Sequence, residues 1–314
     1  MLSVLGITFP IFATIGLGYL LTRRGLFAPG DMSVLGRFVI NIALPALIFT
    51  GVTSRPLGEV FDAGYAIGYA LIALLNGSLG FLVMTLAGWR GQKRAVGVLG
   101  MTCSNSGYIG YPLMMLASPD HAGPFLTLNL IVENFFIVPL AILLMELSRP
   151  QSNVAPLRLI WAIAIGLLRR PMILLLLVGL AVNLSGIPLP VGLSRLSALF
   201  AAASSALALF YIGGSLVGLP LRGNTALATT IVVMKLFMMP LMALAVLRFG
   251  PMLGLPPVGP GFDFALIVTG ALPMLGVYAI LAAEHRQEGM ASIALLGGTA
   301  TAFFTLSALL ALTH

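Results

Sequence analysis

The residues best suited to bind a polar solute are gathered in one short stretch of an otherwise apolar segment. Residues 104–112 read Ser-Asn-Ser-Gly-Tyr-Ile-Gly-Tyr-Pro. The two glycines loosen the backbone, and Pro112 removes an amide donor and clashes with the preceding helical turn. A membrane helix tolerates such a break only where the freed backbone groups face protein or a water-filled cavity. Broken helices of this kind build the substrate sites of secondary transporters, so the pattern favours a transporter.

A second break is predicted in residues 269–278, which read Thr-Gly-Ala-Leu-Pro-Met-Leu-Gly-Val-Tyr. This stretch is mostly apolar, and neither Asn nor Ser directly follows Pro273. Polar recognition is therefore expected mainly from the first break. Together with polar residues of neighbouring spans, the two breaks give these candidate substrate-binding residues: Asn41, Ser104, Asn105, Ser106, Gly107, Tyr108, Gly110, Pro112, Lys235, Pro273 and Tyr278.

Two charged side chains, Glu133 and Lys235, are expected near the middle of the membrane. A charge at that depth costs about 2.5–3.5 kcal/mol on insertion scales, so each one needs an explanation. In a functional interpretation, Glu133 is a protonatable coupling group and Lys235 supplies positive charge near an anion path. In a structural interpretation, the two side chains pair and hold their helices together. The sequence leaves both interpretations open.

Several asparagines and tyrosines lie at the same depth. An asparagine in a membrane helix often bonds to a neighbouring helix, at about 0.6–2 kcal/mol, and we expect this of Asn76, Asn129 and Asn134. For Asn105, beside the break, contact with substrate or water is the stronger expectation. Asn41 precedes Pro45 by four residues, so its amide is expected to bond a carbonyl near the proline kink or to face the substrate path. The tyrosines beside the two breaks either gate the site or pack.

Composition sets the class of protein. Of 314 residues, 59 % are hydrophobic and 8 % are charged, against roughly 25 % charged in soluble proteins. This leaves no room for a sizeable aqueous domain and predicts an all-α, multi-pass membrane protein. The net charge of +7 is expected to report topology and not nucleic-acid binding.

Enzyme chemistry is not indicated. A single cysteine excludes an internal disulfide and a cysteine-based metal site. The three histidines, His121, His285 and His314, have no metal-ligand spacing and accompany no Ser or Cys nucleophile. We therefore expect neither a cofactor nor a metal, and no enzymatic activity.

Ten membrane spans can be marked by their polar boundaries. They are 3–22, 34–53, 64–88, 94–117, 122–147, 171–188, 195–219, 225–248, 263–283 and 290–312. Most basic loop residues follow odd-numbered spans, whereas the loops after even-numbered spans hold only Arg55, Arg195 and Arg248. The positive-inside rule then places both termini outside.

The chain is expected to divide into two related halves. These are a five-helix repeat at 1–147, a cytoplasmic linker with an interfacial helix at 148–170, and a second repeat at 171–314. A shift of 161 positions places Pro10 on Pro171 and Pro112 on Pro273. Because five spans is an odd number, the second repeat must enter the membrane inverted, which is typical of transporters.

At these residues the chain resembles the auxin efflux carrier (AEC) family of membrane transporters, and within it the bacterial malonate-type carriers. The resemblance rests on Asn-Ile-Ala-Leu-Pro-Ala-Leu-Ile-Phe at 41–49, on residues 104–113 and on Leu-Pro-Met-Leu-Gly-Val-Tyr at 272–278. It implies ten helices in two inverted repeats, with broken helices 4 and 9 crossing at the centre. Spans 1, 2, 6 and 7 would form a scaffold, and spans 3–5 and 8–10 a moving transport domain.

The resemblance also implies organic-anion transport by an elevator-like movement, commonly by a homodimer. The amide-bearing N-terminus of each second half-helix would favour negative charge. Coupling to protons or to sodium stays open, so a sodium-coupled symporter is an alternative. A second alternative, from another functional class, is a transporter-like sensor that binds ligand without moving it.

Overall fold

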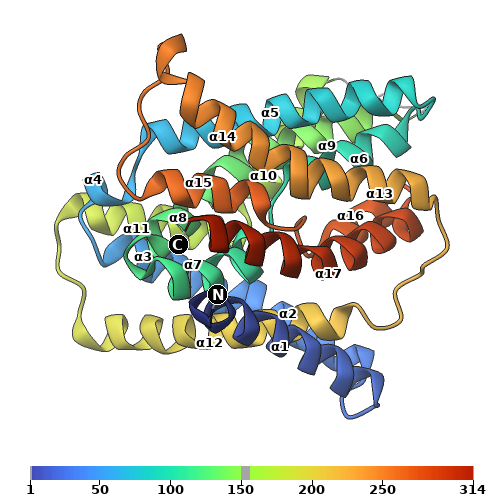
Figure 1. Cartoon of the computed structure of the whole chain (residues 1–314). Coiled ribbons are helices and arrows are strands. Elements are labelled where there is room, and N and C mark those ends of the chain that lie inside the picture. The colour runs from blue at the N-terminus through green and yellow to red at the C-terminus, as the bar shows by residue number, and fades with distance from the viewer. Residues whose placement is uncertain (1, 150–155, 314) are drawn as a thin grey trace.

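Because apolar segments must satisfy their backbone hydrogen bonds internally, a chain of this composition is expected to fold as helices. The computed structural model describes residues 2–149 and 156–313. In these residues the regular structure is helical, apart from one isolated β-bridge between Ser104 and Met274 (Figure 1). Residues 150–155 of the predicted linker lie outside the described residues.

The elements of residues 2–149 overlap the first five predicted spans, and span 94–117 is interrupted. They are α1 (Leu2–Arg23), α2 (Pro29–Phe38), η1 (Val39–Ala43), α3 (Leu44–Thr53), α4 (Leu57–Val60), α5 (Ala63–Leu86), α6 (Gln92–Thr102), η2 (Ser106–Gly110), α7 (Tyr111–Ala117), α8 (Pro119–Val132), η3 (Glu133–Ile137) and α9 (Val138–Leu147).

The second half begins after a linker helix, α10 (Pro156–Leu168). Its elements are α11 (Pro171–Ser185), α12 (Val191–Ser215), α13 (Thr225–Val233), η4 (Met234–Met238), α14 (Met239–Phe249), η5 (Pro251–Leu253), α15 (Phe262–Ala271), α16 (Tyr278–Ala283) and α17 (Glu288–Thr313).

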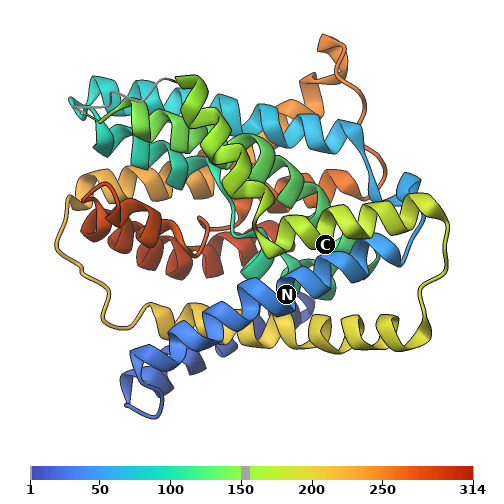
Figure 2. The same cartoon turned by 180° about the vertical axis from the view of Figure 1, so that it is seen from behind.

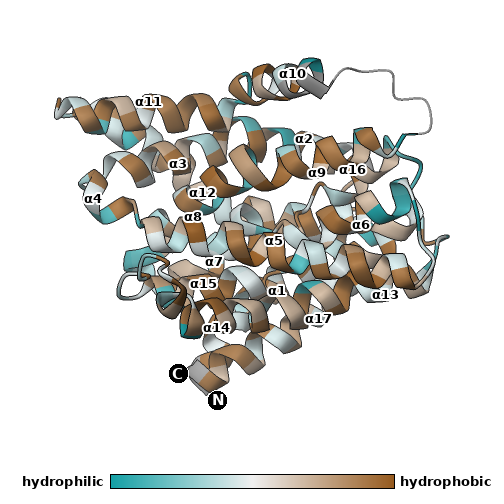
Figure 3. Cartoon of the chain, turned by 90° about the horizontal axis from the view of Figure 1, so that it is seen from above, coloured by the Kyte–Doolittle hydropathy of each residue, from teal (hydrophilic) through white to brown (hydrophobic). Residues whose placement is uncertain are grey.

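Seven helices among the described residues are long and apolar enough to cross a membrane. An eighth crossing is formed if α10 and α11, which meet at an angle of 70°, act as one bent span. The predicted spans 94–117 and 263–283 are interrupted, so neither forms one long helix. Hydrophobic residues run along almost every helix (Figure 3), and the chain is a multi-pass membrane protein.

The helices form two groups that pack against each other. The panel consists of α1, α2, α3, α11 and α12, and the bundle consists of α5 to α9 and α13 to α17. Figure 2 shows α11 and α12 on the panel side, with the bundle behind and above them. The two groups meet where η2 contacts α12 and where α8 contacts α3. Residues of both groups therefore face one interface.

Four elements are π-helical turns: η1, η2, η3 and η4. Such a turn inserts one extra residue into a helix and often marks a functional position. The four turns contain Asn41, Ser106, Glu133 and Lys235, all of which were singled out from the sequence. The sequence did not predict the π geometry itself.

Candidate functional site

The two broken helices lie against each other at their non-helical residues. α6 ends at Thr102 and α15 ends at Ala271, and Ser104 pairs with Met274 in an antiparallel bridge. The backbone N–H of Asn105 donates to the carbonyl oxygen of Pro273 at 2.9 Å. In return, Leu275 donates its backbone N–H to the Cys103 carbonyl at 3.2 Å. Main-chain hydrogen bonds thus join the two breaks directly.

The first break is not centred on its proline. The non-helical residues are 103–105, whereas Pro112 lies in the first turn of α7, after the π-turn η2. The helix already begins at Ser106, and the π-turn η2 directly before Pro112 accommodates the missing amide and the ring of the proline without ending the helix. In the second break, by contrast, Pro273 is itself non-helical. The sequence argument therefore found the first break, but Pro112 is not its cause.

A cavity of about 340 Å³ opens at the crossing. Its lining comes from both breaks, from the panel and from the bundle, so it lies across the interface between the two groups. The lining residues are Ile40, Asn41, Leu44, residues 103–108, Leu130, Glu133, Asn134, Val138, residues 170–172, residues 275–277 and Leu281.

The structure brings many, but not all, of the predicted site residues to this cavity. Those in the lining are Asn41, Ser104, Asn105, Ser106, Gly107, Tyr108 and the coupling candidate Glu133. Those outside the lining are Gly110, Pro112, Lys235, Pro273 and Tyr278. Tyr278 is buried, and its hydroxyl donates to the Val96 carbonyl at 3.0 Å, which supports a packing role.

Asn105 has the feature expected of a ligand-binding residue. It is 2 % exposed and lines the cavity, yet its side-chain amide nitrogen has no hydrogen-bond partner. The hydroxyl of Tyr108, also in the lining, is likewise buried without a partner, and its ring lies 5.6 Å from that of Tyr211 in α12. A buried donor without an acceptor costs about 1–3 kcal/mol, and a bound acceptor would recover this cost.

Glu133 is held by hydroxyl groups. Its Oε1 accepts a hydrogen bond from the Tyr69 hydroxyl at 2.9 Å and another from the Ser106 hydroxyl at 2.5 Å. The amide of Asn129 donates to Ser106 at 2.9 Å and so connects the carboxyl group to α8. Tyr69 comes from α5 and carries no signal in the sequence beyond being an aromatic residue in a span.

The network continues to the second break. The Tyr65 hydroxyl donates to Asn129 Oδ1 at 2.6 Å and lies 2.7 Å from the hydroxyl of Thr269. Ser104 donates its hydroxyl to the Thr269 carbonyl at 2.7 Å. Asn129 therefore bonds between helices, as expected, within a larger network that sequence analysis did not predict.

Lys235 is fully buried, and its side chain reaches the last turn of α15, where the second break begins. Its Nζ donates to the carbonyl oxygens of Gly270 at 3.0 Å and Thr269 at 3.4 Å. No direct ion pair joins Lys235 to Glu133; among the described residues the ion pairs are Arg55–Asp120 and Arg149–Glu146. Of the two interpretations left open by the sequence, direct pairing of the side chains is therefore not seen, because the ammonium group binds carbonyls at the end of α15.

Arg170 is a site residue that sequence analysis missed. The sequence places it at the end of the predicted linker, and in the structure it lies in the connection between α10 and α11, where these helices meet at 70°. There it lines the central cavity, and its Nη1 donates to Asn134 Oδ1 at 3.2 Å. Pro171, which starts α11, is the only nearby signal for a sharp change of direction. The predicted interfacial helix thus leads directly into the site.

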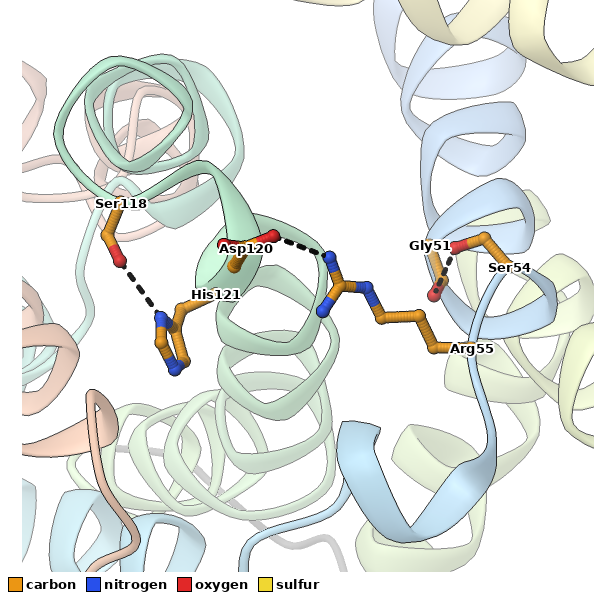
Figure 4. Close-up of polar contacts among 6 residues, drawn as sticks. All are labelled: Gly51, Ser54, Arg55, Ser118, Asp120 and His121. Carbon is orange, nitrogen blue, oxygen red and sulfur yellow. Dashed lines mark hydrogen bonds and ion pairs between the residues drawn. The ribbon is translucent and has the colours of Figure 1, made fainter.

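A second cavity of about 430 Å³ lies elsewhere on the interface between α3, α8 and α12. Arg55 at the end of α3 reaches across it and forms an ion pair of 3.0 Å with Asp120 in α8 (Figure 4). In the same view, Ser118 and His121 Nδ1 are hydrogen-bonded at 2.9 Å. Gly51 and Gly123 also meet here, so the two helices touch without intervening side chains.

Comparison with known proteins identifies the family. The model of the membrane transport protein family (Mem_trans), the auxin efflux carrier family, matches residues 3–310. The chain belongs to this family. It is therefore a transport protein and not an enzyme.

Two relatives support this assignment. A protein of Rhizobium meliloti (strain 1021) named "Putative malonate transporter" is 30 % identical over 263 residues, which covers 80 % of this chain and 78 % of the relative. A protein of Methanothermobacter thermautotrophicus (strain Delta H) named "Uncharacterized transporter" is 28 % identical over 287 residues, covering 87 % and 85 %.

Proposed function

We propose that this chain is a secondary carrier of small organic anions, with carboxylates as its substrates. The observation that carries the proposal is the buried amide of Asn105, an unpaired donor in the lining of the central cavity. Tyr108 adds a second unpaired hydroxyl to the same lining. Two free donors favour a solute rich in acceptor oxygens, and a carboxylate offers two oxygens with about four lone-pair sites. The name of the Rhizobium relative supports this class.

Transport would proceed by alternating access of elevator type. The bundle would move against the panel and carry the cavity from one side of the membrane to the other. The cavities at two places along the interface between panel and bundle support this division. In this proposal the chain makes ten passes as two inverted repeats, 1–147 and 171–314, with both termini outside, and it works as a homodimer in the bacterial inner membrane.

Glu133 is proposed to couple transport to protons. Glu133 lines the cavity, and its carboxyl group accepts hydrogen bonds from Tyr69 and Ser106, so its protonation would change contacts in both α5 and η2. Sodium coupling would use backbone carbonyls of the breaks. The carbonyls of Thr269 and Gly270 already accept hydrogen bonds from Lys235, which favours protons over sodium.

The test is a measurement on purified protein in proteoliposomes. Charge movement on a solid-supported membrane and uptake of labelled malonate are recorded with the wild-type protein and with Asn105→Ala. We expect saturable malonate transport that the substitution abolishes. Electroneutral anion–proton symport would give uptake without current. Absence of both signals from demonstrably folded protein, over a panel of small carboxylates, would contradict the proposal and favour a ligand sensor.

A further inference from the structure

Among the described residues that line the central cavity, Arg170 is the one with a positively charged side chain. Its recorded polar contact is the hydrogen bond to Asn134, a neutral side chain. No carboxylate of the described residues lies within 4.0 Å of its guanidinium. The ion pairs within residues 2–149 and 156–313 are Arg55–Asp120 and Arg149–Glu146. Arg170 is thus an exposed cation that also lines the cavity and has no anionic partner among the described residues.

The chemistry of the guanidinium group indicates which kind of ligand Arg170 would bind. Arginine carries five N–H donors in a rigid fork, which matches the two oxygens of a carboxylate. Such charge-assisted bonds are roughly twice as strong as neutral ones. The bond to Asn134 engages Nη1 and leaves other donors of the fork for a ligand. Glu133, the acidic residue in the lining, is already engaged by Tyr69 and Ser106.

The position of Arg170 separates it from Asn105. Arg170 immediately precedes α11, which packs on α3 in the panel, whereas Asn105 lies in the break of the bundle. Both residues line one cavity. A ligand with a single carboxylate can accept hydrogen bonds from one of these two residues, while a ligand with two carboxylates can accept from both.

We propose that Arg170 is a substrate-binding residue that recognises a second carboxylate and so makes the carrier selective for short dicarboxylates over monocarboxylates. This inference rests on the proposed function, in which Asn105 binds the first carboxylate. A bound dicarboxylate bridges panel and bundle, and its second carboxylate takes over the donor that Arg170 now gives to Asn134. Arg170 therefore acts as a specificity determinant contributed by the panel.

The experiment measures binding of malonate, succinate and acetate to the purified full chain by calorimetry. The variants are Arg170→Gln, which removes the charge, and Arg170→Lys, which keeps the charge but not the fork. The matched control is Arg169→Gln, which removes the same charge from the adjacent position outside the cavity lining. Thermal unfolding and size-exclusion profiles of each variant establish that it is folded.

For Arg170→Gln we expect the affinity for malonate and succinate to fall about ten- to a hundredfold, the usual range for a lost charge-assisted hydrogen bond. Acetate affinity should change less than threefold, and Arg170→Lys should lose less than Arg170→Gln. Arg169→Gln should bind all three as the wild type does.

Equal losses for acetate and the dicarboxylates would show that Arg170 does not select for a second carboxylate, and unchanged malonate affinity would show that it does not touch the ligand. Either result overturns the inference and leaves the carrier intact. If the folded wild-type protein binds none of the three acids, the proposed carboxylate substrate fails, and the inference fails with it.

Discussion

The two broken helices contribute to the centre of the molecule in different ways. The first break presents side chains: Asn105 leaves a free amide at the cavity, and Ser106 donates to Glu133. The second break presents its backbone: the Pro273 carbonyl accepts from Asn105, and the Gly270 carbonyl accepts from Lys235. Met274, the partner of Ser104 in the bridge, is fully buried and apolar.

This difference shows that two matching breaks need not share one task. In the first break a change of side chain alters what the cavity can bind. In the second break most side chains are apolar, and the carbonyls that hold the crossing together are present whatever the residue. Substitutions in the first break should therefore affect transport. Substitutions in the second break, or of Lys235 that bonds to its carbonyls, should affect mainly stability.

The largest effect on transport is expected from Asn105→Ala. The substitution removes the unpaired donor from the cavity without cutting any hydrogen bond recorded for that amide. Uptake of labelled malonate should fall more than tenfold, whereas the unfolding temperature should hardly change. The control is Asn76→Ala, which removes a donor to the Met101 carbonyl away from the cavity lining and should chiefly lower stability. Undiminished uptake by Asn105→Ala would remove it from the site.

Lys235→Met should act through stability. The substitution keeps much of the side-chain volume but leaves the carbonyl of Gly270 without its buried donor, at a cost of about 1–3 kcal/mol. Thermal unfolding in detergent should show a lower midpoint, and malonate affinity of the folded fraction should stay near that of the wild type. Lys93→Met, at an exposed position in the first turn of α6, serves as the control. A stable variant with much weaker malonate binding would place Lys235 in the anion path instead.

Glu133→Gln tests the coupling role. Glutamine still accepts hydrogen bonds from Tyr69 and Ser106 but carries no titratable proton, so the fold should persist. Malonate uptake by the wild type should vary with pH, and the variant should show a flat pH profile with a few-fold lower rate. Glu146→Gln, which removes a surface partner of Arg149, should retain the wild-type profile. If Glu133→Gln also retains it, the role of Glu133 is structural.

The smallest effect is expected from Pro273→Ala. Alanine keeps the carbonyl that accepts from Asn105. Without the proline ring the unfolded chain has more conformational entropy, which lowers the free energy of unfolding by about 0.4–1 kcal/mol. Uptake should stay within about twofold of the wild type. Gly107→Ala provides the comparison in the first break, because the residue lines the cavity beside Leu44. Equal loss in both variants would contradict the division of tasks between the breaks.

Much of the fold was predictable because it depends on composition and on the polar residues that bound each apolar stretch. Apolar stretches between charged loops predicted the helices, and the polar run around Asn105 predicted a break that the structure contains. Ten spans stay a prediction, because seven helices of the described residues are long and apolar enough to cross a membrane and an eighth crossing needs the bent α10–α11 pair. The interrupted helices and this pair do not form long straight helices. Their bends depend on tertiary contacts that no local pattern encodes.

The site was predictable only in part, for a similar reason. Asn105 and Glu133 were identified because polar groups are costly in an apolar span. Tyr65, Tyr69 and Thr269 were missed because a hydroxyl in a span gives no sign of its partner. Arg170 does lie, exposed, in the connection between α10 and α11, but counting positive charges gave no sign that it also lines the cavity. Only the bend before Pro171 brings it to the cavity.

The bridge between Ser104 and Met274 has a mechanical consequence. Main-chain hydrogen bonds from Asn105 and Leu275 fasten one interrupted helix to the other at the points where each is weakest. Bending at either interruption would have to break these bonds away from bulk water, where nothing else replaces them. The crossing is therefore a stiff joint: in the proposed elevator movement the two interrupted helices would translate together as one rigid piece, and strain would pass to the connecting loops.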